Sequence, residues 1–167
     1  ESEASSIMLV SDDKKHLFFR IASGEKAKAL KTMTLPIGQG IAGWVAVNRQ
    51  PQMVNNTRKD PRFAGKFDKA SGFQTKSLLC VPMLFRGELV GVVEVLNKKK
   101  GEYTEAHVGL LSSLASLASV AITNTKIIAE QKNFFSHILE LLVGVIETAQ
   151  PGMQDYPVRA AKLACAM

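Results

Sequence analysis

Residues 77–98, SLLCVPMLFRGELVGVVEVLNK, constrain the fold most, because they contain two apolar runs separated by a short polar link. The runs at residues 78–84 and 89–96 are rich in β-branched residues, and the Arg-Gly-Glu link at residues 86–88 is typical of a tight turn. This pattern predicts a β-hairpin. Neither run alternates cleanly between polar and apolar positions, so we expect both faces to be covered and the strands to be central in a sheet.

Glu94 interrupts the apolar pattern of the second strand. With a period of two, it shares a face with Val90, Val92 and Leu96. A carboxylate buried among aliphatic side chains is costly unless something pairs with it. Two interpretations follow: Glu94 lies near a sheet edge or binds a nearby lysine, or its face lines a polar ligand cavity.

Upstream of the hairpin the chain shows further strand and helix patterns. Strands are predicted at residues 6–10, 16–23, 34–36 and 52–54, a helix at 41–48, and either a short helix or a loop at 27–33. Residues 55–76 lack periodicity and contain turn signals, Asp60-Pro61 and Ser71-Gly72. A long irregular segment inside a compact domain is more often a functional loop or lid than a plain connection.

From Thr104, a candidate N-cap with His107 at the capping-box position, the chain is predicted to be helical to about Ala149. Such a helix has about 45 residues and a length of about 70 Å, which exceeds what a small domain covers. One series has heptad spacing, and nine of its eleven members are apolar: Leu110, Leu114, Leu117, Ala121, Asn124, Ile128, Gln131, Phe135, Ile138, Leu142 and Val145.

We call this series the heptad seam, and it predicts a parallel coiled coil of two chains in which Asn124 and Gln131 set the register. The alternative is a break near Lys132-Asn133, after which the helix folds back on itself. Pro151-Gly152 ends the helix in either case.

Composition limits the class of protein. With 167 residues, 46% hydrophobic and 22% charged, the chain fits one globular domain with an appendage. We expect no window as apolar and long as a membrane span, no membrane partner and no signal peptide. Two cysteines, Cys80 and Cys165, form no disulfide framework, which indicates a cytoplasmic protein. The chain opens directly on a strand, as an excised fragment would.

The net charge of +6 is spread along the chain, and its densest cluster is Lys98-Lys99-Lys100. A nucleic-acid surface needs interleaved aromatic residues, and only Tyr103 is nearby. A solvated turn is therefore the preferred interpretation, and no nucleic-acid partner is expected.

The segments LPIGQGIAGWVAVNRQPQMVNN, DPRF, LLCVPM and RGELVGVVEVLNK occur in the order found in GAF domains, and over residues 5–124 the chain resembles this sensory family of bacterial signalling proteins. The resemblance implies an α/β fold: a central antiparallel sheet of about six strands, flanking helices and a long C-terminal connector helix. It also implies a regulatory function, small-ligand binding relayed through the helix to an output domain.

The chain is also similar to the cyclic-nucleotide-binding GAF domains of phosphodiesterases, whose pocket residues correspond to Ile41, Ala42, Asp68, Ser71, Thr75 and Glu94. The backbone N–H groups at the start of the helix at Ile41-Ala42 suit a phosphate or a carbonyl group. Two features depart from the family: Ala64 replaces an aromatic lid residue, and His107-Val108 replaces the Asp-Glu that pairs with the lysine equivalent to Lys98. A cyclic nucleotide is therefore one candidate ligand, and the cofactor stays unknown.

Two enzyme interpretations are disfavoured. Free methionine sulfoxide reductases of the GAF type need several pocket cysteines, and bilin attachment needs a loop cysteine, whereas Cys80 is alone in the domain and within a strand. We expect no catalytic residue and no metal site in this chain. A dimerisation scaffold whose pocket is filled by side chains is the other alternative.

Residues 137–167 resemble the opening of an HD-GYP phosphodiesterase domain, with Arg159 and Leu163 matching and Tyr156 replacing a usual histidine. The predicted organisation is a GAF domain at residues 1–124 without its N-terminal helix, a coiled-coil connector at 125–150, and the start of an output domain at 151–167. Cyclic-di-GMP phosphodiesterase activity is the candidate output, and the expected assembly is a homodimer.

Overall fold

The computed structural model describes residues 1–24, 30, 32–63, 65, 68–69 and 72–149, with only the backbone for 146–149. In chain order its elements are β1 (Ser2–Val10), β2 (His16–Ser23), β3 (Thr34–Pro36), α1 (Gly40–Asn48), β4 (Gln52–Val54), the 3-10 turn η2 (Thr57–Lys59), β5 (Leu78–Phe85), β6 (Glu88–Lys98) and α3 (Glu105–Ala149). The predicted α/β fold, with its hairpin and long C-terminal helix, is confirmed. The ambiguous residues 27–33 fall mostly outside the described residues.

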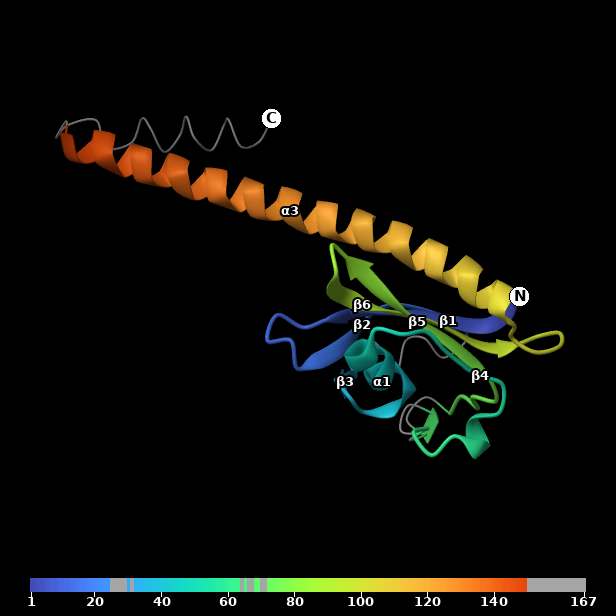
Figure 1. The fold of residues 1–167 in the computed structure, drawn as a ribbon. Helices are drawn as coiled ribbons and strands as arrows, with labels where there is room; N and C mark the ends of the chain where they lie inside the picture. Colours follow the sequence, from blue (N-terminus) through green and yellow to red (C-terminus); the bar gives the residue numbers. More distant parts are fainter. Residues whose placement is uncertain (25–29, 31, 64, 66–67, 70–71, 150–167) are drawn as a thin grey trace. The chain divides into compact units, whose positions relative to one another are not determined.

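Six strands form one antiparallel sheet in the order β3-β2-β1-β6-β5-β4 (Figure 1). The two hairpin strands β5 and β6 are adjacent, and β6 lies in the interior of the sheet between β5 and β1. The expectation that the hairpin strands are central is therefore confirmed, and the strand that carries Glu94 is not an edge strand.

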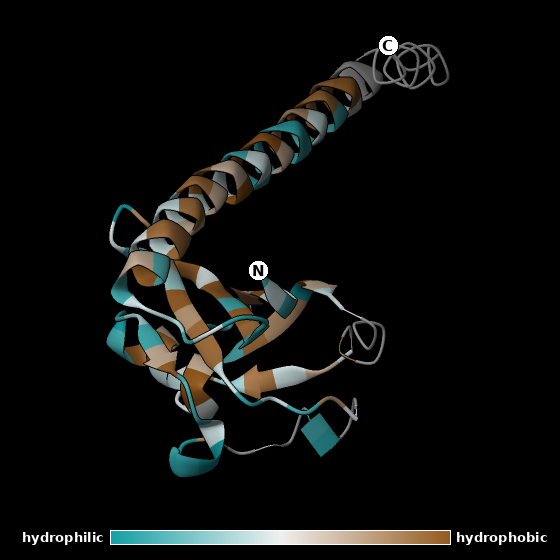
Figure 2. Ribbon diagram, turned by 90° about the vertical axis from the view of Figure 1, so that its right-hand side faces the viewer, coloured by the Kyte–Doolittle hydropathy of each residue, from teal (hydrophilic) through white to brown (hydrophobic). Residues whose placement is uncertain are grey.

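Both faces of the sheet are covered, which explains why the hairpin strands do not alternate. One face packs its buried residues, including Met8, Cys80 and Val92, with those of α1. The opposite face packs Leu79 and other residues against the first turns of α3 (Figure 1). In Figure 2 the brown of hydrophobic residues recurs along the strands of the sheet. Such two-sided burial is the usual reason for near-continuous hydrophobic strands.

The prediction for Val90 was wrong. Val92, Glu94 and Leu96 lie on the α1 side of the sheet, but Val90 packs on the α3 side with Val93 and Val95. The pairing of β5 with β6 shifts by one residue between Met83 and Leu84, so strict alternation ends there. A bulge of this kind turns the following side chains to the other face.

Helix α3 continues through Lys132 and Asn133 up to Ala149, so the break considered there does not occur. At its start, the Thr104 N–H donates to Nδ1 of His107 at 3.0 Å, which is one of the two hydrogen bonds of a capping box. The chain divides into two compact units, Glu1–Thr123 and Asn124–Met167, and α3 contributes to both.

The apolar content of α3 corrects one expectation. Over Glu105–Val145 the helix is long and apolar enough to cross a membrane by length and composition, so the expectation that no window approaches a membrane span was wrong. Within this stretch the side chains of Leu111 and Ala115 are buried against the sheet. The criterion rests on length and composition alone, so one helix that meets it is weak evidence for a membrane.

Candidate ligand-binding cavity

The start of α1 is shaped by glycines. Gly40 has a φ of +68°, which L-amino acids with a side chain rarely adopt, and it opens the helix directly after Gln39. A Cβ on Gly43 would lie 2.9 Å from the backbone N of Gly38, so only glycine allows the preceding loop to lie against the helix. The Gln39 side chain forms no capping hydrogen bond. The N–H groups of Ile41 and Ala42, which have no partner within the helix, therefore remain at its open end.

This helix end opens on a cavity of about 110 Å³ between α1, the sheet and the 55–76 segment. Among the residues assigned from the sequence, Ile41, Ala42, Asp68, Thr75 and Glu94 all line it. Most of its described lining is apolar, with three phenylalanine rings, whereas the sequence interpretation expected a polar cavity. Of the other two residues singled out in this pocket, Ser71 and Ala64 lie outside the described residues.

Glu94 lies in a lateral row with Ser6 on β1 and Cys80 on β5, its register partners on the two neighbouring strands. The Ser6 hydroxyl donates to Oε2 of Glu94 at 3.2 Å, and the Cys80 thiol forms a further hydrogen bond to the same carboxyl group. Burial raises the pKa of Glu94 to about 7, and these two hydrogen bonds lower it only in part. Because β6 is not an edge strand and no lysine among the described residues pairs with Glu94, the edge and lysine interpretations find no support, whereas the Glu94 side chain lines the cavity.

Asp68 and Thr75 bind each other. The backbone N–H of Thr75 donates to Oδ2 of Asp68 at 2.8 Å, and the Thr75 hydroxyl donates to Oδ1 at 2.7 Å. This pair closes a loop within the 55–76 segment. In the structure the two side chains therefore stabilise this loop, as side-chain hydrogen bonds that cap a loop ordinarily do.

Two asparagines fasten the ends of the 55–76 segment. At its beginning, Asn55 accepts from the Tyr103 N–H at 2.8 Å and donates to the Tyr103 carbonyl at 3.1 Å. At its end, Oδ1 of Asn97 accepts from the Lys76 N–H at 2.7 Å, and Nδ2 donates to the carbonyl of Gln74 at 2.7 Å. The beginning of the segment is thus bound to Tyr103, two positions before α3, and its end to Asn97 near the end of β6.

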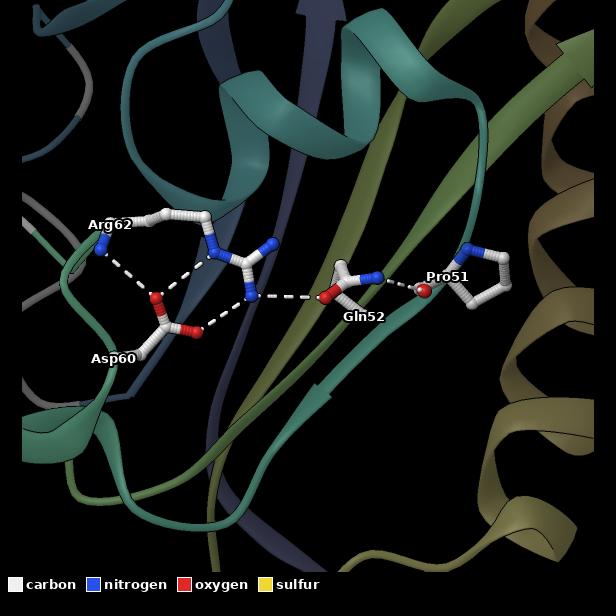
Figure 3. Close-up of polar contacts among 4 residues, drawn as sticks. All are labelled: Pro51, Gln52, Asp60 and Arg62. Carbon is white, nitrogen blue, oxygen red and sulfur yellow. Dashed lines mark hydrogen bonds and ion pairs between the residues drawn. The ribbon is translucent and has the colours of Figure 1, made fainter.

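A third fastening holds the segment against α1 and β4 (Figure 3). Arg62 donates through Nε to Oδ1 of Asp60 at 3.0 Å, and its terminal nitrogen bridges Asp60 at 2.7 Å and Gln52 at 3.0 Å. The guanidinium carbon lies 5.0 Å from the centre of the Trp44 ring. The hydrogen bond from Arg62 lowers the pKa of Asp60, so the pair stays ionised. This arrangement places the adjacent Phe63 in the cavity wall.

A family model for the GAF domain matches residues 1–123. The chain belongs to the GAF domain family. It is 27% identical over 136 residues to a probable 3′,5′-cyclic phosphodiesterase, pde-5, of Caenorhabditis elegans, covering 76% of this chain and 19% of that protein. It is 33% identical over 111 residues to a dual 3′,5′-cyclic-AMP and -GMP phosphodiesterase 11A of Takifugu rubripes, covering 65% of this chain and 12% of that protein.

Among solved structures, the GAF domain of an Acinetobacter phosphoenolpyruvate-protein phosphotransferase superposes with a TM-score of 0.66. It is 22% identical, and the match covers 77% of this chain and 75% of that one. This likeness shows the fold. Membership of the family establishes a regulatory small-molecule-binding module. The chain spans less than a fifth of the length of each of the two phosphodiesterase relatives, so the similarity does not extend to their enzymatic activity.

Among the described residues, Lys98 does not form the lysine–acid ion pair expected from the resemblance, as the sequence indicated. The Lys98 ammonium lies 5.9 Å from the centre of the Tyr103 ring, and His107, at one of the acid positions, caps α3. The Tyr103 hydroxyl is in addition 2.9 Å from Oγ of Ser2. A cation–π contact and a capped helix therefore occupy the place of the ion pair.

Several residues of the GAF cavity and its supports were missed by sequence reasoning. Ser6 could have been found, because a serine two positions before the core residue Met8 is polar in a core-facing register. Asn55, Asn97 and Arg62 follow apolar runs or turn signals, and their local sequence does not identify their partners. Across the described part of the chain, no group of three His, Cys, Asp or Glu side chains could hold a metal ion.

Proposed function

We propose that the GAF domain, residues 1–124, binds a small regulatory molecule in the cavity beside α1 and relays its presence through α3. The observation that carries this proposal is the convergence of the α1 N-terminus, Glu94 and the fastened 55–76 segment on one cavity. Pockets that are mostly apolar, with a few directed polar groups, are typical of ligand sites. Residues 125–150 then act as the connector, and 151–167, which lie outside the described residues, as the start of an output domain.

A cyclic nucleotide is the ligand class that we propose first. Two relatives are cyclic nucleotide phosphodiesterases. The free N–H groups at Ile41 and Ala42 suit a phosphate group, and the aromatic lining, including Phe19 and Phe63, suits a flat base. The Asp68–Thr75 pair weakens this proposal, because neither side chain needs a ligand to satisfy its hydrogen bonds.

We propose that the protein acts as a homodimer through the heptad seam of α3. Leu110, Leu114, Leu117, Ile128, Phe135, Leu142 and Val145 of this seam are all exposed. Parallel association would remove these side chains from water and would align both copies of Asn124 and Gln131. Lys126, Glu130 and Lys132 lie on the same stretch, and charged side chains there favour a water-facing coiled coil over a membrane span.

The second candidate function is a dimerisation scaffold without a ligand, and the self-satisfied Asp68–Thr75 pair is the observation that favours it. A redox enzyme has less support. Cys80 is fully buried, and burial together with Glu94 raises the pKa of its thiol, which makes it a poor nucleophile. We propose a non-catalytic cytoplasmic module, with HD-GYP-type phosphodiesterase chemistry confined to an output domain beyond this chain.

A native mass spectrum of protein purified from cells tests these proposals together. A dimer mass with an additional small molecule supports the ligand-binding module, and a bare dimer supports the scaffold. A thermal-shift screen with cyclic and linear nucleotides then identifies the ligand class. The absence of any shift at millimolar concentration counts against nucleotides.

A further inference from the structure

The row formed by Ser6, Glu94 and Cys80 places a carboxyl group at the cavity wall with only neutral partners. Ser6 is 4% exposed and Cys80 is fully buried, so water reaches this row only through the cavity. Glu94 itself is half-buried, because its side chain lines that cavity. Whatever enters the cavity therefore replaces water next to this carboxyl group.

The charges that face Glu94 can be followed element by element. On its own strand the neighbouring positions of the same face are Val92 and Leu96, and β2 contributes Phe19 to the lining. None of the residues that α1 or β2 contributes to the cavity carries a titratable group. The 55–76 segment contributes Asp68, a second acid, whose carboxylate accepts two hydrogen bonds from Thr75.

Among the residues that the structure describes, no lysine, arginine or histidine lines the cavity. An ionised Glu94 is therefore stabilised by one hydroxyl and one thiol, and it shares the cavity with Asp68. Hydrogen bonds from neutral donors offset only part of the cost of burying a charge. Burial accordingly raises the pKa of Glu94 to about 7, and both of its forms are populated near neutral pH. Cys80 stays a thiol, because burial and the Glu94 charge raise its pKa.

A ligand without positive charge makes the ionised form still less favourable. It displaces the cavity water that solvates the Glu94 carboxylate, and loss of solvation favours the neutral form of an acid. An anionic ligand adds repulsion, whereas the protonated carboxyl group can donate a hydrogen bond to a carbonyl or phosphate oxygen. Only a cationic ligand would reverse this preference.

We propose that the cavity binds an uncharged or anionic ligand together with a proton held by Glu94, so that binding is controlled by pH. The inference rests on the proposed ligand-binding function and adds its regulation. Above neutral pH, each bound ligand takes up as much as one proton. Affinity is then constant in acid and falls as the pH rises through the neutral range, by up to about tenfold per pH unit.

The first measurement needs no ligand. Protein labelled with carbon-13 at the glutamate carboxyl groups is titrated by NMR, and the resonance missing from Glu94→Gln assigns Glu94. The expected midpoint is about pH 7. A midpoint below about pH 5, close to that of an ordinary glutamate, would overturn the proposal.

The second measurement uses cyclic GMP as the probe, by calorimetry between about pH 6 and about pH 8.5 in buffers of different ionisation enthalpy. Cyclic GMP keeps its single negative charge over this range. We expect proton uptake and falling affinity in the wild type, and neither in Glu94→Gln. Glu88→Gln is the matched control, since Glu88 is an exposed residue of the same strand and should keep the wild-type pH profile.

The two proposals fail in different ways. If cyclic GMP does not bind at any pH, the nucleotide proposal fails, and the ligand-free titration alone decides whether Glu94 is a proton switch. If cyclic GMP binds equally at all pH values, the proton-linked inference is overturned while the ligand site stands. A pH profile that persists in Glu94→Gln would assign the proton to another group and would also overturn the inference.

Discussion

The side-chain amide of Asn55 pairs with both backbone polar groups of Tyr103, 48 positions away in the sequence. The two hydrogen bonds, of 2.8 and 3.1 Å, join the start of the 55–76 segment to the residue two positions before α3. A movement of the segment at its start must therefore either carry Tyr103 with it or break these bonds. Asn55 thus joins the segment that contributes to the cavity wall to the residues that lead into α3.

Replacing Asn55 by alanine should lower the free energy of unfolding by about 1–3 kcal/mol, because the backbone N–H of the buried Tyr103 loses its partner. Urea unfolding followed by circular dichroism measures the change. Hydrogen exchange at the start of α3 should also become faster, since this pairing no longer holds the helix entry.

Asn56→Ala is the matched control for Asn55→Ala. Asn56 is exposed, and its side chain makes no capping hydrogen bond to η2. Its removal should change the unfolding free energy by less than about 0.5 kcal/mol. If both variants unfold alike, the Asn55–Tyr103 pairing contributes nothing to the fold.

The strands and helices could be predicted because local patterns determine them. The ends of β2, β3 and β4 coincide with the predicted ends, since turn residues or a proline adjoin these short apolar runs. Side-chain partners far apart in sequence could not be predicted, as the Asn55–Tyr103 pair shows. The orientation of Val90 depends on a shift in strand pairing, which no property of its own strand reveals.

The candidate site was predictable to a similar degree. Glu94 stands out because it is a charge in an apolar strand, but its neighbours Ser6 and Cys80 require the register of three strands. The chemistry of the cavity wall also depends on residues that only the fold brings together, so a polar cavity was expected where a mostly apolar one occurs.

Glu94 should make the fold less stable at high pH. Its pKa is about 7 in the folded protein against an ordinary value of 4.5, so the protonated form is favoured on folding. The stabilisation is complete below about pH 4.5 and is lost as the pH rises through about 7. Because the cavity leaves Glu94 partly solvated, we expect a loss of about 2–3 kcal/mol.

Urea unfolding of the wild type and Glu94→Gln at several pH values tests this dependence. The variant should become more stable relative to the wild type as the pH increases, because glutamine cannot ionise. The stability of Glu88→Gln, at the exposed first position of β6, should follow the pH dependence of the wild type. A constant difference between Glu94→Gln and the wild type would mean that Glu94 titrates at its ordinary value.

Asp68 and Thr75 should act as one unit in ligand binding. Asp68→Ala and Thr75→Ala should each weaken binding of cyclic GMP by about 1–3 kcal/mol, since each removes the hydrogen bond between the two side chains. The double variant should lose little more than Asp68→Ala alone, because the same contact cannot be lost twice. Calorimetry measures all three. Additive losses would instead indicate that each side chain contacts the ligand separately.

The heptad seam should hold the dimer. Leu117 is 69% exposed and Ile128 is 55% exposed, so aspartate at both positions should leave the domain folded while placing two charges in the interface. Sedimentation should then report monomers. Ser116→Asp with Ala129→Asp adds the same charge at exposed positions off the seam and should leave the dimer intact. A dimeric Leu117→Asp, Ile128→Asp variant would place the interface elsewhere.

Ligand binding should alter the packing of the connector around Ile128 and leave the sheet nearly unchanged. The polar pair Asn124 and Gln131 weakens the seam on both sides of Ile128, so two arrangements of similar energy are expected there. A ligand shifts such an equilibrium only by its different affinity for the two states, and the Asn55–Tyr103 pairing is the route by which the cavity can favour one of them. Paired spin labels at Ile128 and Ile138 should therefore show changed interchain distances when cyclic GMP saturates the protein. Asn55→Ala should reduce that change without abolishing binding. Distances that stay constant at both positions would make the connector a static tether.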